Sequence, residues 1–220
     1  MNDPDGVKFY SPAEERLNIA SHALGLVLSL CALIVLVWNA SAIGNAWDVV
    51  IFGIFGLSLV LLYATSTLYH SATEPERRRK LRILDHAMIY VLIAGTYTPL
   101  ALVTLNGSVG WLLFGTAWSM ALTGITLKIF FTGRYQLMST LMYLFMGWIL
   151  VFAINPLFRN LSLEGLYWLL AGGLSYTVGA ILYAIKSIRF NHAIFHVFVL
   201  AGSICHFVTV YAFVLPAIQK

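Results

Sequence analysis

Long runs of hydrophobic residues recur along the whole chain and are separated by short polar segments. In a helix, a run of about 20 residues is long enough to cross the roughly 30 Å hydrocarbon core of a lipid bilayer. The pattern therefore predicts an all-α integral membrane protein in which seven helices span the bilayer. Their expected ranges are residues 17–38, 49–70, 84–104, 108–130, 136–155, 163–185 and 193–215.

The composition leaves almost no residues for a soluble domain. Of the 220 residues, 60% are hydrophobic and 10% are charged, whereas charged residues make up roughly 25% of soluble domains. We expect a short cytoplasmic N-terminal segment over residues 1–16 and a single seven-helix domain over residues 17–220. The first hydrophobic run is too long for a signal peptide and follows acidic instead of basic residues, so it is expected to remain as the first span.

Lysine and arginine residues are distributed unevenly between the two sides of the predicted bundle. Only Arg159 and Lys220 lie on one side, and eleven lie on the other. Because cytoplasmic loops carry the excess of basic residues, the N-terminus is expected in the cytoplasm and the C-terminus outside. The net charge of +4 is then a signal for orientation and lipid contact that requires no nucleic-acid partner. The eleven are Lys8, Arg16, Arg77, Arg78, Arg79, Lys80, Arg82, Lys128, Arg134, Lys186 and Arg189.

Three histidines collect where the predicted spans reach the cytoplasmic side. His70 ends the second span, and His192 and His196 begin the last one. Residues four apart in a helix project from one face, so the latter two can bind a single ion. Three imidazoles are the usual ligand count of a catalytic zinc that keeps its fourth position for water. The sequence therefore predicts a Zn²⁺ site with His70, His192 and His196 as ligands.

Two further polar residues are expected beside this metal. Asp85, at the predicted start of the third span, would offset the cost of a cation near a helix N-terminus and would orient or deprotonate a bound water. Its alternative role is an N-cap. Ser66, one turn before His70, would hydrogen-bond the water or polarise a substrate carbonyl. The alternative for Ser66 is a small packing residue that bonds back to its own helix.

The other histidines and several small residues are interpreted as architecture. His22 and His86 are expected to be interfacial or hydrogen-bonding residues, and His206, deeper in the membrane, a buried interhelical hydrogen-bonder. Pro99 is expected to kink the third span, which could open space for a cavity. Two cysteines within predicted spans favour small buried side chains over a disulfide. They are Cys31 and Cys205.

The order of these motifs resembles the PAQR superfamily, which includes the adiponectin receptors, and most closely its bacterial hemolysin III branch. The resemblance is carried by Ser66-x-x-x-His70, Asp85 and His192-x-x-x-His196, and it covers nearly the whole chain. It implies seven helices, a cytoplasmic N-terminus, and zinc held by the three histidines with Ser66 and Asp85 around a bound water. Kinship with alkaline ceramidases suggests hydrolysis of a lipid amide or ester. Further matching segments are residues 14–22, 94–99 and 205–207.

Two departures from the family pattern limit what the resemblance implies. The separation of His70 from Asp85 differs from that in the receptors, and their long N-terminal region has no counterpart here. Receptor signalling is therefore not carried over.

Several functions stay open at this point. The first is a zinc-dependent hydrolase of the bacterial inner membrane, with a membrane lipid as substrate. The second is a metal-stabilised sensor or regulator of membrane homeostasis, with a lipid as ligand. A pore-forming hemolysin is disfavoured because the chain looks like a resident membrane protein. A transporter is disfavoured because its polar residues stop near one face. The substrate, any protein partner and the oligomeric state are not indicated.

Overall fold

The computed structural model describes residues 8–131 and 136–219, and over these residues it is helical throughout, without strands. The helices are α1 (Pro12–Ile43), α2 (Ala46–Ser71), α3 (Pro75–Pro99), α4 (Gly107–Phe131), α5 (Gln136–Trp148), α6 (Ile154–Asn160), α7 (Leu163–Ala184) and α8 (Asn191–Val208). Short irregular helical segments extend three of them: η1 (Leu100–Leu105) follows α3, η2 (Ile149–Ala153) links α5 to α6, and η3 (Thr209–Val214) and η4 (Leu215–Gln219) follow α8.

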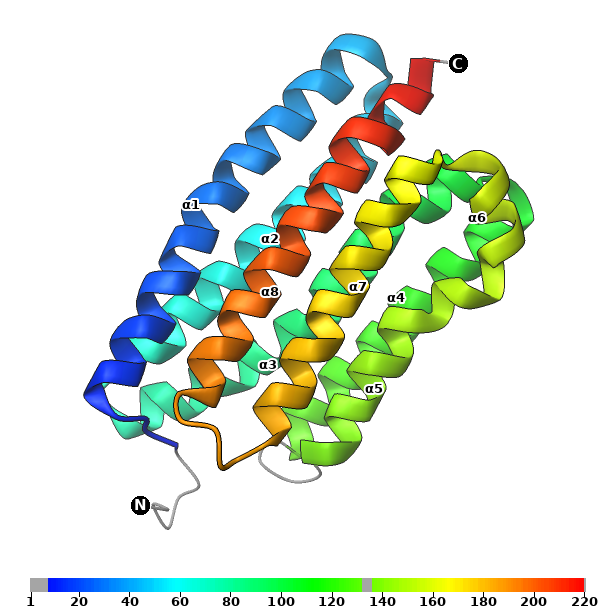
Figure 1. Cartoon of the computed structure of the whole chain (residues 1–220). Coiled ribbons are helices and arrows are strands. Elements are labelled where there is room, and N and C mark those ends of the chain that lie inside the picture. The colour runs from blue at the N-terminus through cyan, green and yellow to red at the C-terminus, as the bar shows by residue number, and fades with distance from the viewer. Residues whose placement is uncertain (1–7, 132–135, 220) are drawn as a thin grey trace.

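Within the described residues, seven helical segments are long and apolar enough to cross a membrane, which confirms the predicted fold. Figure 1 shows them as one bundle, with the start of α1 and the end of the last helix at opposite ends. α1 packs against α2 and α8, and α8 packs against α7. The segments are Pro12–Ile43, Ala46–Ser71, Pro75–Leu105, Gly107–Phe130, Met138–Asn160, Leu163–Ala184 and Asn191–Gln219.

The surface of the bundle is apolar, as a lipid environment requires. Large side chains such as Trp38, Leu112 and Phe152 are 73%, 72% and 84% exposed. Cys31 also lies on this outer surface, so the expectation that it is buried was wrong, whereas Cys205 is partly buried and neither cysteine forms a disulfide. When a helix is hydrophobic on all sides, its sequence does not show which residues face the lipid and which face the bundle, and this explains the error.

Two helices begin earlier than the hydrophobic pattern predicted. α1 begins at Pro12, where Ser11 accepts a hydrogen bond from the Glu14 backbone N–H. α3 begins at Pro75, capped by Glu74. Proline at the first position and an oxygen-bearing cap are common helix starts, but both lie in polar sequence that a search for apolar runs passes over.

The early start of α3 changes the interpretation of its charged residues. The basic run from Arg77 to Arg82 lies in the first turns of the helix instead of in a connection between spans. Asp85 lies within α3, so its alternative role as an N-cap was wrong. Two residues used to infer orientation, Arg134 and Lys220, lie outside the described residues.

The third span is interrupted at Pro99, as expected. α3 ends there and the next six residues, Leu100–Leu105, form a π-helix. Proline has no N–H and its ring crowds the carbonyl four residues earlier, so the regular hydrogen-bond ladder cannot continue. A cavity borders this interruption at Tyr97 and Leu100.

Candidate metal centre

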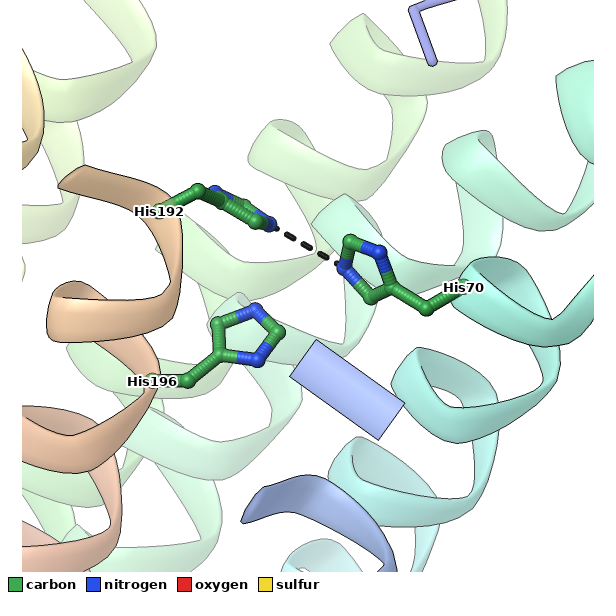
Figure 2. A group of neighbouring side chains, drawn as sticks. All are labelled: His70, His192 and His196. Atoms are coloured by element: carbon green, nitrogen blue, oxygen red, sulfur yellow. Dashed lines mark hydrogen bonds between the residues drawn. The ribbon is translucent and has the colours of Figure 1, made fainter. Parts of the chain in front are cut away.

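Three buried histidines meet at the end of the bundle where α1 begins. His70 lies in the last turn of α2, and His192 and His196 lie in the first two turns of α8. Each offers one ligand atom, and these three atoms all lie within 4.8 Å of one another. Figure 2 shows the three imidazoles facing one common space. The predicted convergence of these residues is present, and the cluster could bind a metal ion.

The donor chemistry of the cluster fits a tetrahedral metal. His70 Nε2 and His192 Nε2 are 3.1 Å apart, and two nitrogens bound to one zinc at about 2.0–2.1 Å with tetrahedral angles lie roughly 3.3 Å apart. Neutral imidazole carries one donor and one acceptor nitrogen, so the same contact also suits a hydrogen bond between the rings. All three histidines are buried, so each ring nitrogen needs a polar partner.

Several buried polar atoms near the histidines have no hydrogen-bond partner. They include Ser66 Oγ, His192 Nδ1 and both ring nitrogens of His22. Buried polar groups normally form hydrogen bonds, and each buried group without one lowers the folding stability by about 1–3 kcal/mol. Their concentration around the histidine cluster fits a site that binds a hydrated ion and a polar substrate group. The structure thus shows unpartnered polar atoms beside the three histidines that could bind a metal.

A carboxylate on α1 orients the first of the three histidines. Glu15 Oε2 lies 2.7 Å from His70 Nδ1. When Nδ1 donates its proton to this carboxylate, the lone pair of the ring is on Nε2, which faces the cluster. Metal-binding histidines commonly donate their second nitrogen to a carboxylate, which fixes the ring and raises its basicity.

Glu15 is in turn held by an arginine that is only 1% exposed. Arg78 forms an ion pair with Glu15 Oε1. Its guanidinium also donates to the carbonyls of Tyr69, His70 and Ala72, at 3.3, 3.4 and 3.0 Å. These carbonyls lie at the C-terminal end of α2, where a cation is favourable. Arg78 therefore fixes the helix end that carries His70.

The turn before α8 fixes the other two histidines. Phe190 has φ of 59°, the left-handed region that a bulky residue rarely adopts. Asn191 Nδ2 donates to the Tyr183 carbonyl at 2.7 Å and so ties the start of α8 to the end of α7. Tyr10 stacks on the His192 ring, with centroids 4.6 Å apart. The first turn of α8 is thereby held on both sides.

The two predicted non-ligand residues border the same space as the histidines. Ser66 is buried one turn before His70, and its Oγ makes no bond to its own helix, so the alternative of a back-bonded packing residue was wrong. The Asp85 carboxylate lies 3.6 Å from His86 Nδ1. Both residues line one cavity together with His192 and His196. Their chemical roles stay predictions.

The structure confirms the interpretation of two of the remaining histidines and contradicts the third. His86 Nδ1 lies 2.7 Å from the Arg82 carbonyl, and His206 Nε2 lies 3.2 Å from the Leu169 carbonyl, which confirms both as hydrogen-bonding residues. The interpretation of His22 was wrong. It is buried, makes no hydrogen bond, and stacks on His196 with ring centroids 3.5 Å apart.

The cavity beside the histidines has a volume of about 320 Å³ and a mostly apolar lining. His22, Ser66 and Asp85 line it beside His192 and His196. From there the cavity runs between α3, α5, α7 and α8 past aliphatic and aromatic side chains such as Leu150 and Phe158. Ligand sites in proteins are commonly apolar cavities of about 300–1,000 Å³ with a few convergent polar groups.

Comparison with known proteins agrees with this arrangement. The family described as "Haemolysin-III related" matches residues 10–207. The chain belongs to the haemolysin-III family. It is 49% identical to Hemolysin-3 of Bacillus cereus over 203 residues, which is 92% of this chain and 93% of that protein. It is 50% identical to the Hemolysin-3 homolog of Bacillus subtilis (strain 168) over 194 residues, 88% of this chain and 91% of that protein.

A more distant relative extends the comparison to animals. The monocyte to macrophage differentiation factor of Homo sapiens is 25% identical over 177 residues, 77% of this chain and 72% of that protein. This similarity is consistent with the PAQR superfamily, and the resemblance inferred from the motifs is confirmed. The haemolysin-III match includes every residue of the histidine cluster, because it begins at Tyr10 and ends after His206.

Sequence reasoning missed part of this haemolysin-III site. Glu15 was assigned to a segment before the first helix, and Arg78 to a membrane-facing basic run, whereas both are part of the support of His70. Glu15, Asn18 and His22 are spaced at i, i+3 and i+7, which places them on one face of a helix. This spacing could have indicated that the first helix contributes to the site. Asn18 is fully buried, and its Nδ2 lies 3.4 Å from His70 Nδ1.

Proposed function

We propose that the chain is a zinc-dependent hydrolase that cleaves an amide or ester bond of a membrane lipid. The observation that carries the proposal is the joining of a buried three-histidine cluster to an apolar cavity within the membrane-spanning bundle. The histidines would hold the metal, and the cavity would hold an acyl chain. When bound, Zn²⁺ would lower the pKa of a coordinated water toward neutrality and polarise a carbonyl.

The ligand count supports catalysis over a purely structural metal. Structural zinc sites are closed by four protein ligands, whereas catalytic sites keep one position open. The ligand group found among the described residues contains three histidines and no carboxylate or cysteine. A metal-stabilised sensor with a closed site is therefore less well supported.

Each residue around the cluster has a role in the proposed reaction. Asp85 accepts a proton from the attacking water and returns it to the leaving amine or alcohol as the C–N or C–O bond breaks. Ser66 Oγ, which is unpartnered, donates to the carbonyl oxygen as negative charge develops there. Glu15 keeps His70 in the tautomer whose Nε2 faces the cluster. The products are a fatty acid and the amine or alcohol part of the lipid.

We further propose that the histidine end of the bundle faces the cytoplasm of a bacterial inner membrane. Basic residues gather at this end, including Lys8, Arg82 and Lys186, and Arg159 lies at the other. The excess of basic residues on one side supports this orientation. Alkaline phosphatase fused after the C-terminus would be active in this orientation and inactive in the reverse one.

The hydrolase proposal is tested with purified protein in nanodiscs, loaded with zinc and supplied with lipid amides and esters. Release of free fatty acid is measured by mass spectrometry. The wild type is expected to release fatty acid from at least one lipid class, and His70→Ala is expected to release none above background. Equal release by both proteins, or none from any lipid by a zinc-loaded wild type, would contradict the proposal.

A further inference from the structure

A second, smaller pocket of about 60 Å³ lies beside His192 at the same end of the bundle. Three cationic side chains line it, from three separate parts of the chain: Lys8 before α1, Arg82 in α3 and Lys186 after α7. Its lining contains no carboxylate. Three cations thus line the pocket, and the charge of Asp85 also acts on its Tyr10, Tyr69 and Tyr183 side chains.

The two lysines bend over the pocket and its aromatic walls. Lys8 Nζ lies 4.3 Å from the centre of the Tyr10 ring, and Lys186 Nζ lies 3.9 Å from the centre of the Tyr183 ring. Lys186 also donates to the Tyr183 carbonyl at 2.8 Å. Cation–π contacts of this kind hold an ammonium group near a protein wall.

The cations in this pocket repel one another. Burial lowers the pKa of Lys8, and the nearby charges of Lys186 and Arg82 lower it further, although Glu14 and Glu15 partly oppose this. Repulsion between like charges destabilises the pocket, and a bound anion would offset this repulsion. The arrangement thus favours an anion in the pocket.

The size of the pocket fits a phosphate group. One water-sized position needs about 10–15 Å³ of volume, so 60 Å³ holds roughly four to six such positions. A phosphate presents four oxygens, and lysine and arginine are the side chains that most often bind it. Tyr10, Tyr69 and Tyr183 also line the pocket.

The basic pocket and the apolar cavity meet at the histidine cluster. Both are lined by His86, Tyr183 and His192. A lipid whose carbonyl lies at the histidines would place its acyl chain in the cavity of 320 Å³ and its headgroup in the pocket of 60 Å³. The two volumes thus correspond to the two halves of one amphipathic molecule.

We propose that the basic pocket binds the phosphate of an anionic lipid headgroup, and that the lipid cleaved by this protein carries such a group. The statement about cleavage rests on the proposed hydrolase function. The statement about binding does not, because Lys8, Arg82 and Lys186 are independent of the metal.

The test is native mass spectrometry of the full-length chain released from nanodiscs that contain equal amounts of phosphatidylglycerol and phosphatidylcholine with identical acyl chains. The wild type is expected to retain phosphatidylglycerol at least fivefold over phosphatidylcholine, and Lys8→Gln/Lys186→Gln is expected to reduce this ratio to near one. The matched control is Arg77→Gln/Arg79→Gln, which removes two exposed charges from the same end of the bundle but outside the pocket. The control is expected to keep the wild-type ratio.

Three results would overturn the proposal. The first is a wild-type ratio near one. The second is an equal loss in the pocket variant and the control, which would assign the preference to general surface charge. The third is displacement of phosphatidylglycerol by inorganic phosphate alone, which would assign the pocket to a free anion. Retention of the lipid in the presence of inorganic phosphate supports a headgroup.

This binding measurement and the fatty-acid release assay together separate this proposal from the hydrolase function. Native mass spectrometry detects binding without turnover. A headgroup preference in a protein that hydrolyses no lipid would reject the hydrolase and keep the pocket. Hydrolysis that is indifferent to the headgroup would keep the hydrolase and reject the statement that the cleaved lipid carries an anionic headgroup.

Discussion

Replacing Asp85 with asparagine is expected to leave zinc bound and to reduce lipid hydrolysis by about 10²–10⁴-fold, the usual contribution of a general acid–base group. The asparagine keeps the size of the side chain but cannot accept the proton of the attacking water. Asp85 lines the cavity with Ser66 and His196, whereas the ligand group consists of histidines alone. Turnover number and metal content are measured on the same preparation.

The control for this variant is Glu76→Gln, which removes an exposed carboxylate from the same helix. It is expected to retain wild-type turnover. Full activity in Asp85→Asn would show that this carboxylate does not transfer the proton. Loss of zinc together with activity would instead make Asp85 a ligand, and the assignment of roles around the metal would be wrong.

Replacing Glu15 with glutamine is expected to weaken zinc binding by about 10–100-fold, the range found when a carboxylate partner of a metal-binding histidine is removed. Glutamine can still accept a hydrogen bond from His70 Nδ1, but it no longer supplies the negative charge that raises the basicity of the ring. It also leaves the buried Arg78 without its carboxylate partner. The zinc dissociation constant is measured by competition with a chromophoric chelator in detergent.

Glu14→Gln is the matched control, because it removes the same charge from the adjacent residue. Within the part of the chain that the structure describes, the Glu14 side chain forms no hydrogen bond or ion pair with the three histidines. It is expected to bind zinc like the wild type. Thermal unfolding of both metal-free variants separates weaker binding from loss of fold. Equal dissociation constants for Glu15→Gln and Glu14→Gln would limit Glu15 to a structural role.

The sequence was sufficient to predict the seven spans and the three clustered histidines. Apolar runs long enough to cross a bilayer leave few other folds open, and the spacing of His192 and His196 places both on one face of a helix. His70 could be added because its span ends on the same side of the membrane.

The support of the cluster could not be predicted in the same way. Glu15 and Arg78 lie in polar sequence next to the apolar runs, where a charged residue is usually solvated, and only the packing of α1 against α2 and the early start of α3 bring them to His70. The rotation of α1 about its axis likewise decides that His22 faces His196 instead of the membrane surface. Such rotation depends on packing with other helices, which a pattern of apolar residues does not specify.

The metal centre itself is tested most directly by elemental analysis of detergent-purified protein that carries no histidine tag and has met no chelator. We predict about one zinc per chain in the wild type, as expected for a single three-histidine site, and none above background in His192→Ala/His196→Ala. A folded wild type without bound metal, or a double variant that retains the wild-type amount, would contradict the account.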